Sequence, residues 1–245
     1  RVSSVDDLLQ FTKNEDIPPI AIKVVLKSDF SPIKSVFPKE NLCFSILGDG
    51  SVLRSENDSG KYFEDVSTFG FDTYLSDIVF LNEKTGWVSG STFLNDSTPI
   101  QINYFIKKTT DAGETWTEYS SSQKISNFQH LSFVDSLYGW CYSDLNDSLR
   151  CVWNTTDGGK TWSPNIVNAP NSLANFLGFQ DRLNGWIVLS DPTPYMPWYI
   201  YRTKDGGKTW QPFTQTFSIF QLFFVNNNTF YGGGDINLIK ATGID

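Results

Sequence analysis

The residues of this sequence that could perform acid–base chemistry are its carboxylates and its one histidine, His130. Two carboxylates at a fixed separation are the machinery of glycoside hydrolysis, and a histidine can act as a general base. No serine or cysteine nucleophile is arranged with a base in the sequence. The residue types therefore leave two functions open, hydrolysis by aspartates and ligand binding without catalysis.

An eight-residue stretch repeats along the chain and sets where these side chains can lie. Residues 155–162 read TTDGGKTW, and the stretch recurs at 109–116, at 203–210 and, in degenerate form, at 56–63. Its aspartate can accept hydrogen bonds from the N–H groups of its own turn, its glycine permits positive φ, and its tryptophan anchors the flanking strands. We therefore predict a structural hairpin turn, formed by Asp58, Asp111, Gly113, Trp116, Asp157, Gly159, Trp162, Asp205, Gly207 and Trp210.

This stretch is identified as the Asp-box, or BNR repeat, and the chain resembles Asp-box β-propellers. The resemblance is closest to the small-bladed propellers of photosystem II assembly factors. Sialidases, sortilin-like receptors and some xyloglucan hydrolases also carry the box. The resemblance implies that the box lies at the turn between the third and fourth strands of a blade, and it implies no particular activity.

A second landmark precedes each box, namely a phenylalanine followed seven residues later by another aromatic residue. The clear copies are Phe80/Trp87, Phe133/Trp140 and Phe179/Trp186, and the weaker ones are Phe37/Phe44 and Phe224/Tyr231. Their intervals of 43, 53, 46 and 45 residues are typical of propeller blades. We predict one all-β domain over residues 1–245, a β-propeller with five four-stranded blades at about 33–68, 76–120, 129–167, 175–215 and 220–245.

The fifth unit ends before its fourth strand, so the ring needs a strand from elsewhere. The step from the box aromatic to the next phenylalanine is 17 residues in three units, and 17 residues before Phe37 stands Ile20. Residues 20–26 form a β-rich apolar run after two prolines. We predict that this run closes the ring and that residues 1–17 are a leader.

In propellers, the loops after the second and fourth strands of each blade surround the mouth of the central channel. Three residues before each phenylalanine, at the mouth end of the first strand, stand Lys34, Asp77, His130, Phe176 and Gln221. Asp144 and Asp191 end the second strands of blades 3 and 4. We expect Asp77, His130, Asp144 and Asp191 to contact a ligand. Alternatively, the strand-end aspartates only begin turns, and the other two only line the channel.

The loop 191–199 carries three prolines and three aromatic residues, so it offers a stiff apolar surface to the ligand. Tyr195 and Trp198 are its candidate contacts. Alternatively, Trp198 begins the third strand and packs between blades.

These placements favour a non-catalytic propeller that binds a protein or a glycan at the channel mouth. The alternative is a glycoside hydrolase that uses aspartates, although all seven glutamates fall away from the mouth. A sialidase is disfavoured because its three substrate-binding arginines have no counterpart there. Arg54, Arg150 and Arg202 fall on third strands.

Composition and charge further restrict the classes of partner that we expect. The net charge is −8 and there is no Lys/Arg cluster, so we expect no nucleic acid, and no apolar run is long enough for a spanning helix. With a single histidine we expect no metal and no cofactor. The chain begins at Arg1, which fits an exported monomer or a trimmed chain. Cys141 and Cys151 flank a turn, so they form either a disulfide or two buried thiols.

Overall fold

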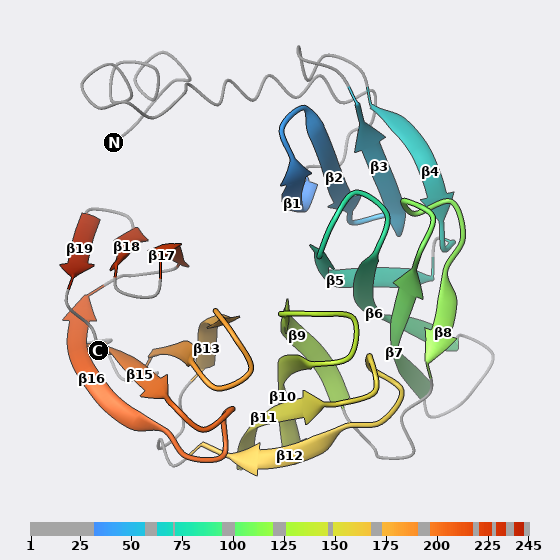
Figure 1. The fold of residues 1–245 in the computed structure, drawn as a ribbon. Helices are drawn as coiled ribbons and strands as arrows, with labels where there is room; N and C mark the ends of the chain where they lie inside the picture. The colour runs from blue at the N-terminus through green and yellow to red at the C-terminus, as the bar shows by residue number, and fades with distance from the viewer. Residues whose placement is uncertain are drawn as a thin grey trace.

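The protein is a five-bladed β-propeller, as the sequence predicts. Five antiparallel sheets stand around a common centre in the computed structural model, each with its first strand innermost (Figure 1). Four sheets have four strands, and the fifth has three among the described residues. The structure describes residues 32–56, 63–70, 72–94, 101–119, 126–146, 149–167, 173–190, 197–217, 221–226, 229–233 and 238–242. The predicted closing strand 20–26, the leader 1–17 and Asp58 lie outside these ranges.

The strands follow one another from the centre outward in every blade. Blade 1 contains β1 (Pro32–Lys39), β2 (Leu42–Leu47), β3 (Ser51–Ser55) and β4 (Glu64–Thr68). Blade 2 contains β5 (Thr73–Phe80), β6 (Gly86–Leu94), β7 (Gln101–Thr109) and β8 (Thr117–Tyr119). Blade 3 contains β9 (Ser126–Phe133), β10 (Gly139–Asn146), β11 (Leu149–Thr155) and β12 (Ser163–Ile166). Blade 4 contains β13 (Leu173–Phe179), β14 (Gly185–Ser190), β15 (Pro197–Thr203) and β16 (Gln211–Phe217). Blade 5 contains β17 (Gln221–Asn226), β18 (Thr229–Gly233) and β19 (Leu238–Thr242).

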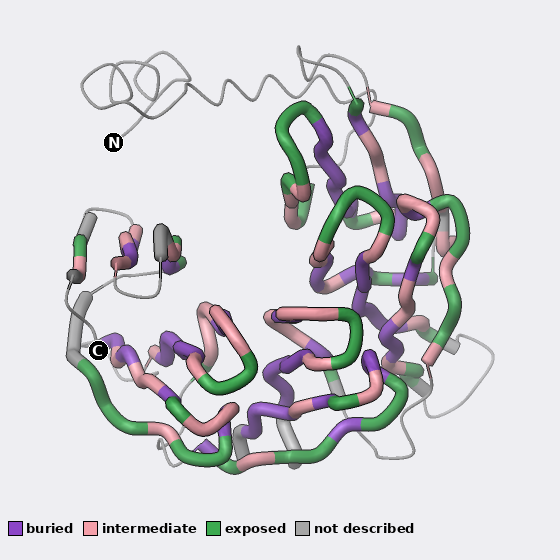
Figure 2. The backbone as a smooth tube through the Cα atoms, in the orientation of Figure 1, coloured by how far each residue is buried: buried purple, intermediate pink, exposed green. Residues whose placement is uncertain are grey.

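The Phe and Trp landmarks are the joints between blades. Trp87 of blade 2 stacks on Phe133 of blade 3 with ring centroids 3.7 Å apart, and Trp140 stacks on Phe179 at the same distance. Phe44 and Phe80 form the first joint at 3.9 Å. Buried residues concentrate along the second strands, where these rings lie (Figure 2). The seven-residue spacing of these aromatic residues therefore reflects packing between neighbouring blades.

The glycine that precedes each of these tryptophans makes room for the phenylalanine ring of its own blade. Phe133 pairs directly with Gly139, and a Cβ at that glycine would lie 2.4 Å from the ring. Gly86 would meet Phe80 at 2.7 Å in the same way. The glycine thus lets the ring lie flat on its own sheet, where the next aromatic residue covers it.

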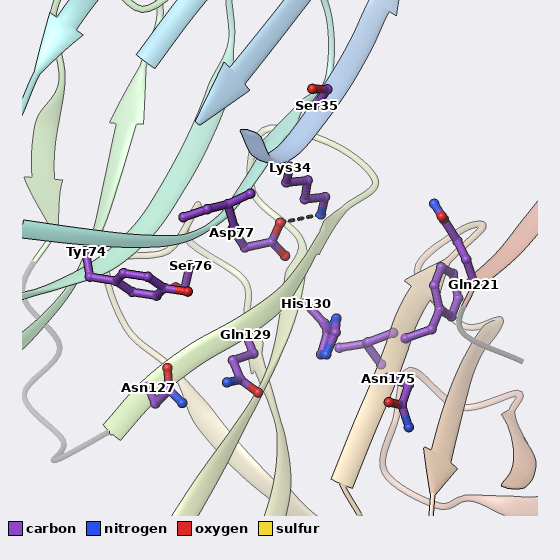
Figure 3. Close-up of a pocket in the computed structure, with 13 residues that line it drawn as sticks. Lys34, Ser35, Tyr74, Ser76, Asp77, Asn127, Gln129, His130, Asn175 and Gln221 are labelled. Carbon is purple, nitrogen blue, oxygen red and sulfur yellow. Dashed lines mark hydrogen bonds and ion pairs between the residues drawn. The ribbon is translucent and has the colours of Figure 1, made fainter. Parts of the chain in front are cut away.

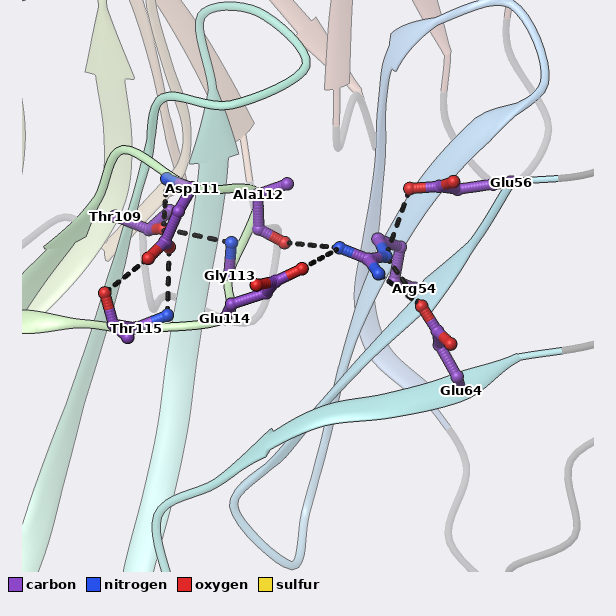
Figure 4. Close-up of polar contacts among 9 residues, drawn as sticks. All are labelled: Arg54, Glu56, Glu64, Thr109, Asp111, Ala112, Gly113, Glu114 and Thr115. Atoms are coloured by element: carbon purple, nitrogen blue, oxygen red, sulfur yellow. Dashed lines mark hydrogen bonds and ion pairs between the residues drawn. The ribbon is translucent and has the colours of Figure 1, made fainter.

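The Asp-boxes close the turns between third and fourth strands, as predicted from the resemblance. In the box of blade 2, Asp111 accepts hydrogen bonds from Thr109 Oγ1 at 2.7 Å and from the Thr115 N–H at 2.9 Å (Figure 4). The boxes at Asp157 and Asp205 repeat both contacts. The box tryptophans Trp162 and Trp210 donate to their glycine carbonyls, at Gly159 and Gly207.

The boxes also join neighbouring blades. The indole N–H of Trp87 donates to the Gly158 carbonyl of the next blade at 2.8 Å, and that of Trp140 donates to Gly206 at 2.8 Å. Arg54 of blade 1 reaches Glu114 in the box of blade 2 while pairing with Glu56 and Glu64 (Figure 4). Each of the three described boxes therefore stabilises its own turn and one interface between blades.

The cysteine bridge expected between Cys141 and Cys151 does not form. Cys141 stands opposite Trp153 and Cys151 opposite Ser143, so the two thiols are two residues out of register. None of the three cysteines is bridged, and all are buried. Burial raises the pKa of the Cys141 thiol well above its usual value. The pair therefore follows the alternative of two buried thiols, and the exported location remains a prediction.

Candidate functional site

A cavity of about 810 Å³ opens among the innermost strands of all five blades (Figure 3). The five positions that stand three residues before the landmark phenylalanines all line it: Lys34, Asp77, His130, Phe176 and Gln221. Register therefore brings together residues that lie up to 187 positions apart in the chain (221 − 34). This cavity is the candidate binding site.

A recurrent β-bulge shapes the cavity wall. In β5, Leu75 pairs with Gly90 and Asp77 with Ser89, so one extra residue, Ser76, has no partner. The register of β1 and of β13 shifts at the corresponding place. A bulge re-aims side chains next to it, and Ser76 and Asp77 both line the cavity. Next to the bulge, at least two consecutive residues of β1, β5 and β13 therefore line the cavity.

Asp77 ties three blades together at this wall. It is 2% exposed, forms an ion pair with Lys34 of blade 1, and accepts the backbone N–H of Leu131 in blade 3 at 2.6 Å. The Ile78 N–H donates to it at 2.7 Å. The sequence predicts Asp77 as a ligand contact, and the structure gives its carboxylate protein partners instead. Its position on the cavity is as expected.

His130 connects blade 3 to blade 4. Its Nε2 lies 3.0 Å from the Ala174 carbonyl, which can only accept, so this nitrogen carries the proton. Burial lowers the pKa of His130, although Asp77 and the Ala174 carbonyl act in the opposite direction. Its backbone has φ 52°, a left-handed conformation at the bulge of β9. The imidazole is therefore neutral near pH 7 and held in one orientation.

Carboxamide side chains form the rest of the polar wall. Asn127, Gln129 and Gln221 line the cavity, and none has a hydrogen-bond partner among the described residues. Beside them lie Asn175 and the ring of Tyr74, which is 48% exposed. Sequence reasoning missed Asn127, Gln129, Asn175 and Tyr74. The signal was available, because they stand four or six residues before a landmark phenylalanine.

Of the remaining predicted contacts, Trp198 lies in the core, and the side chains of the other three are not described. Trp198 lies in β15 and is 6% exposed, packed with Trp186 and Ile200 in the core between blades 4 and 5. Its expected role on an exposed surface is wrong, because the third strand begins before it. Asp144 pairs with Arg150 in the β10–β11 ladder, at a place where side chains are not described. Asp191 and Tyr195 lie outside the described residues.

Neither a metal-ligand cluster nor a membrane-spanning helix is found among the described residues. Among them, no three His, Cys, Asp or Glu side chains are grouped as metal ligands. No helix in that part of the chain is long and apolar enough to cross a membrane. Arg54 and Arg202 lie on the third strands β3 and β15, away from the channel.

Five radial sheets, Asp-box turns and an inner cavity define an Asp-box β-propeller. The sequence profile of the BNR/Asp-box repeat matches residues 201–212, which contain the box at Asp205. No curated protein matches the sequence significantly.

Solved structures with similar folds include several propellers. A GH74 xyloglucanase from Xanthomonas campestris is 12% identical with a TM-score of 0.58, over 84% of this chain and 35% of that one. The Malassezia sympodialis allergen Mala s 1 is 8% identical with a TM-score of 0.50, over 86% and 78%. YCF48 bound to a D1 peptide is 12% identical with a TM-score of 0.47, over 90% and 95%. This chain thus spans about a third of the xyloglucanase, and the likenesses concern the fold alone.

Proposed function

We propose that this propeller is a non-catalytic binding module whose cavity takes a neutral segment of a protein or a glycan. The observation that carries the proposal is the set of carboxamides, Asn127, Gln129 and Gln221, that face the cavity without partners among the described residues. Each carboxamide offers donors and an acceptor at once, which suits peptide groups and hydroxyl groups alike.

The charges at the cavity support a neutral ligand. Lys34 and Asp77 neutralise each other, and His130 is uncharged near neutral pH. The cavity is therefore close to neutral although the whole chain carries −8. Its size, about 810 Å³, lies within the range of sites that enclose small ligands or chain segments.

The same wall argues against glycoside hydrolysis. That reaction needs two carboxyl groups, one of them able to donate a proton. Among the described residues that line the cavity, Asp77 is the one carboxylate, and it pairs with Lys34 and accepts hydrogen bonds from two backbone N–H groups. A carboxylate with all its oxygens engaged is poorly placed to attack or to deliver a proton.

A binding screen on peptide and glycan arrays tests the proposal, with Gln129→Ala against Gln211→Ala. Gln129 lines the cavity, whereas Gln211 is an exposed carboxamide on β16, the outermost strand of blade 4. Loss of one hydrogen bond predicts about 3- to 10-fold weaker binding for Gln129→Ala alone.

Equal effects of the two variants on affinity would indicate that the binding site lies outside the channel cavity. Hydrolysis of a bound glycan, abolished in Asp77→Asn at unchanged folded fraction, would make the protein an enzyme and overturn the proposal. The variant Glu114→Ala, in the Asp-box turn of blade 2, serves as a second control.

A further inference from the structure

The two ring nitrogens of His130 differ in what they bond. Nε2 lies 3.0 Å from the Ala174 carbonyl of blade 4 and carries the proton, so Nδ1 of the neutral ring is an acceptor with a lone pair. No hydrogen bond to Nδ1 is made within the described part of the chain. The imidazole lines the cavity and lies between Asp77 and Asn175 in the view of Figure 3. The cavity wall therefore holds a nitrogen that can accept a hydrogen bond and cannot donate one.

We propose that Nδ1 of His130 accepts a hydrogen bond from a backbone N–H of a peptide segment bound in the cavity. The inference rests on the proposed function, and it decides between the two kinds of ligand left open there. It also makes His130 a determinant of specificity. An acceptor at this place selects a ligand group that donates, and it disfavours a group that can only accept, such as a carboxylate.

The backbone conformation of β9 supports a role for His130 beyond folding. Among the described residues other than glycine, four have positive φ, and two of them, Asn41 and Ala112, lie in turns. The other two, Asn127 with φ 59° and His130 with φ 52°, lie inside β9 at its two register shifts. A left-handed conformation inside a strand is strained for a residue with a side chain, and such residues cluster at functional sites. Both strained residues of β9 line the cavity.

The lining of the cavity matches the two kinds of group in a peptide segment. Blades 3 and 4 supply the carboxamides Asn127, Gln129 and Asn175, which can pair with both the N–H and the C=O of a peptide group. Blades 1 and 2 supply Ile33, which is 37% exposed, and the half-exposed ring of Tyr74. Ile33 suits an apolar side chain of the ligand, whereas a sugar hydroxyl buried against it would lose its hydrogen bonds to water. These contacts favour a peptide over a glycan.

The charged groups around the imidazole come from blades 1 and 2. Burial lowers the pKa of His130, Asp77 of β5 raises it and Lys34 of β1 lowers it, and these two charged residues pair with each other. The inner strands β13 and β17 carry no ionisable side chain. The other ionisable residues on β5 and β10 are Tyr74, Cys141, Tyr142 and Asp144. Protonation of the imidazole would turn Nδ1 into a donor, so peptide binding should weaken at acid pH.

Amide-to-ester scanning of a bound peptide tests the hydrogen bond. The probe is the acetylated and amidated peptide without charged residues that binds most strongly on the peptide array, measured in solution by calorimetry. One ester, which replaces a single backbone N–H by oxygen, should weaken binding to the natural chain by about 3- to 10-fold. The same ester should leave binding to His130→Gln unchanged, because this variant lacks the ring acceptor. Equal losses with both proteins would overturn the proposal.

Acid pH tests the same contact in the natural chain, without a substitution that could disturb folding. Since His130 is the one histidine, the NMR signals of isotope-labelled histidine report its pKa directly. The probe peptide should lower that pKa, and its Kd should rise by up to about 10-fold per pH unit below the pKa of the free protein. Circular dichroism at each pH corrects for the folded fraction. A pKa that the bound peptide leaves unchanged or raises would contradict the proposal.

Gln129→Ala separates a failure of this inference from a failure of the proposed function. Weaker peptide binding in Gln129→Ala, with no ester effect that depends on His130, would keep the cavity as the binding site and overturn His130 as the acceptor. Unchanged peptide binding in Gln129→Ala would overturn the cavity as the site and, with it, this inference. Glycans that bind in the cavity where no peptide does would keep the proposed function and overturn the peptide assignment.

Discussion

Lys34 of blade 1 and Asp77 of blade 2 form an ion pair on the channel wall, and the same carboxylate accepts the Leu131 N–H of blade 3. The Asp77 side chain thus contacts residues of three blades. Because Asp77 is buried, removal of its carboxylate charge should cost more stability than breaking an exposed ion pair does.

Asp77→Asn should lower the free energy of unfolding by about 2–4 kcal/mol, because it removes a buried charge that three groups solvate. Urea denaturation measures the loss. Glu83→Gln, which breaks the exposed pair with Lys39, should cost no more than about 1 kcal/mol. Similar losses for the two variants would show that Asp77 acts as an ordinary surface charge.

Asp157→Ala should cost about 1–3 kcal/mol, since it removes the acceptor for the Thr155 and Thr161 hydroxyls and two backbone N–H groups. Burial raises the pKa of Asp157, but these hydrogen bonds together hold it below its ordinary value. The charged box therefore stabilises the fold above the unfolded pKa of 3.8, and this contribution is lost as pH falls through the lower folded value. An acid titration of stability that is identical for Asp157→Ala and the natural chain would contradict this account.

His130→Gln should flatten the pH dependence of stability below pH 6.5. The folded pKa lies below the ordinary value of 6.5, so the unfolded chain binds the proton first. Stability of the natural chain should therefore fall as pH drops from 6.5 toward the folded pKa. Melting temperatures between pH 7 and pH 5 measure the effect, and since His130 is the one histidine, no other imidazole contributes.

Gly139→Ala should destabilise by about 1–3 kcal/mol, because the new methyl group would lie 2.4 Å from the Phe133 ring and force it off Trp87. Gly233→Ala is the matched control in β18, where an added Cβ meets nothing within 4 Å. Loss of the near-ultraviolet tryptophan signal should accompany the first change alone. An equal loss in both variants would indicate a backbone effect common to strand glycines.

Removal of residues 1–27 should yield an insoluble protein or a much lower melting temperature. The reason is the predicted strand at 20–26, whose absence would leave an open edge on the last blade. A truncated chain that stays monomeric and melts like the full chain would show that this segment does not close the ring.

The repeats predicted the architecture because each motif is local. Asp157 bonds to residues within four positions of itself, so the box can be read directly from the sequence. The glycine before each tryptophan can also be recognised in the sequence. The reason for it, an aromatic ring that lies over the glycine, cannot be recognised there. Counting from the phenylalanines placed Asp77 and His130 on the cavity.

The contacts that those residues make could not be predicted by counting positions. The partner of Asp77 is 43 positions away, and nothing in either segment marks the pair. The bulge adds a lining position four residues before the phenylalanine in β5, β9 and β13, and so Gln129 and Asn175 were missed. Trp198 was misplaced because a loop of prolines and aromatic residues has no periodicity that marks where the strand begins.

Each complete joint takes its phenylalanine from one blade and its covering ring from the blade before. Within one blade, the phenylalanine of one joint and the covering ring of the next joint stand seven positions apart on a single hairpin. Every repeat therefore carries both halves of the connection. Duplication of one blade within the gene would insert a unit that already fits both neighbours. The number of blades in such a ring can change during evolution without any new interface having to arise.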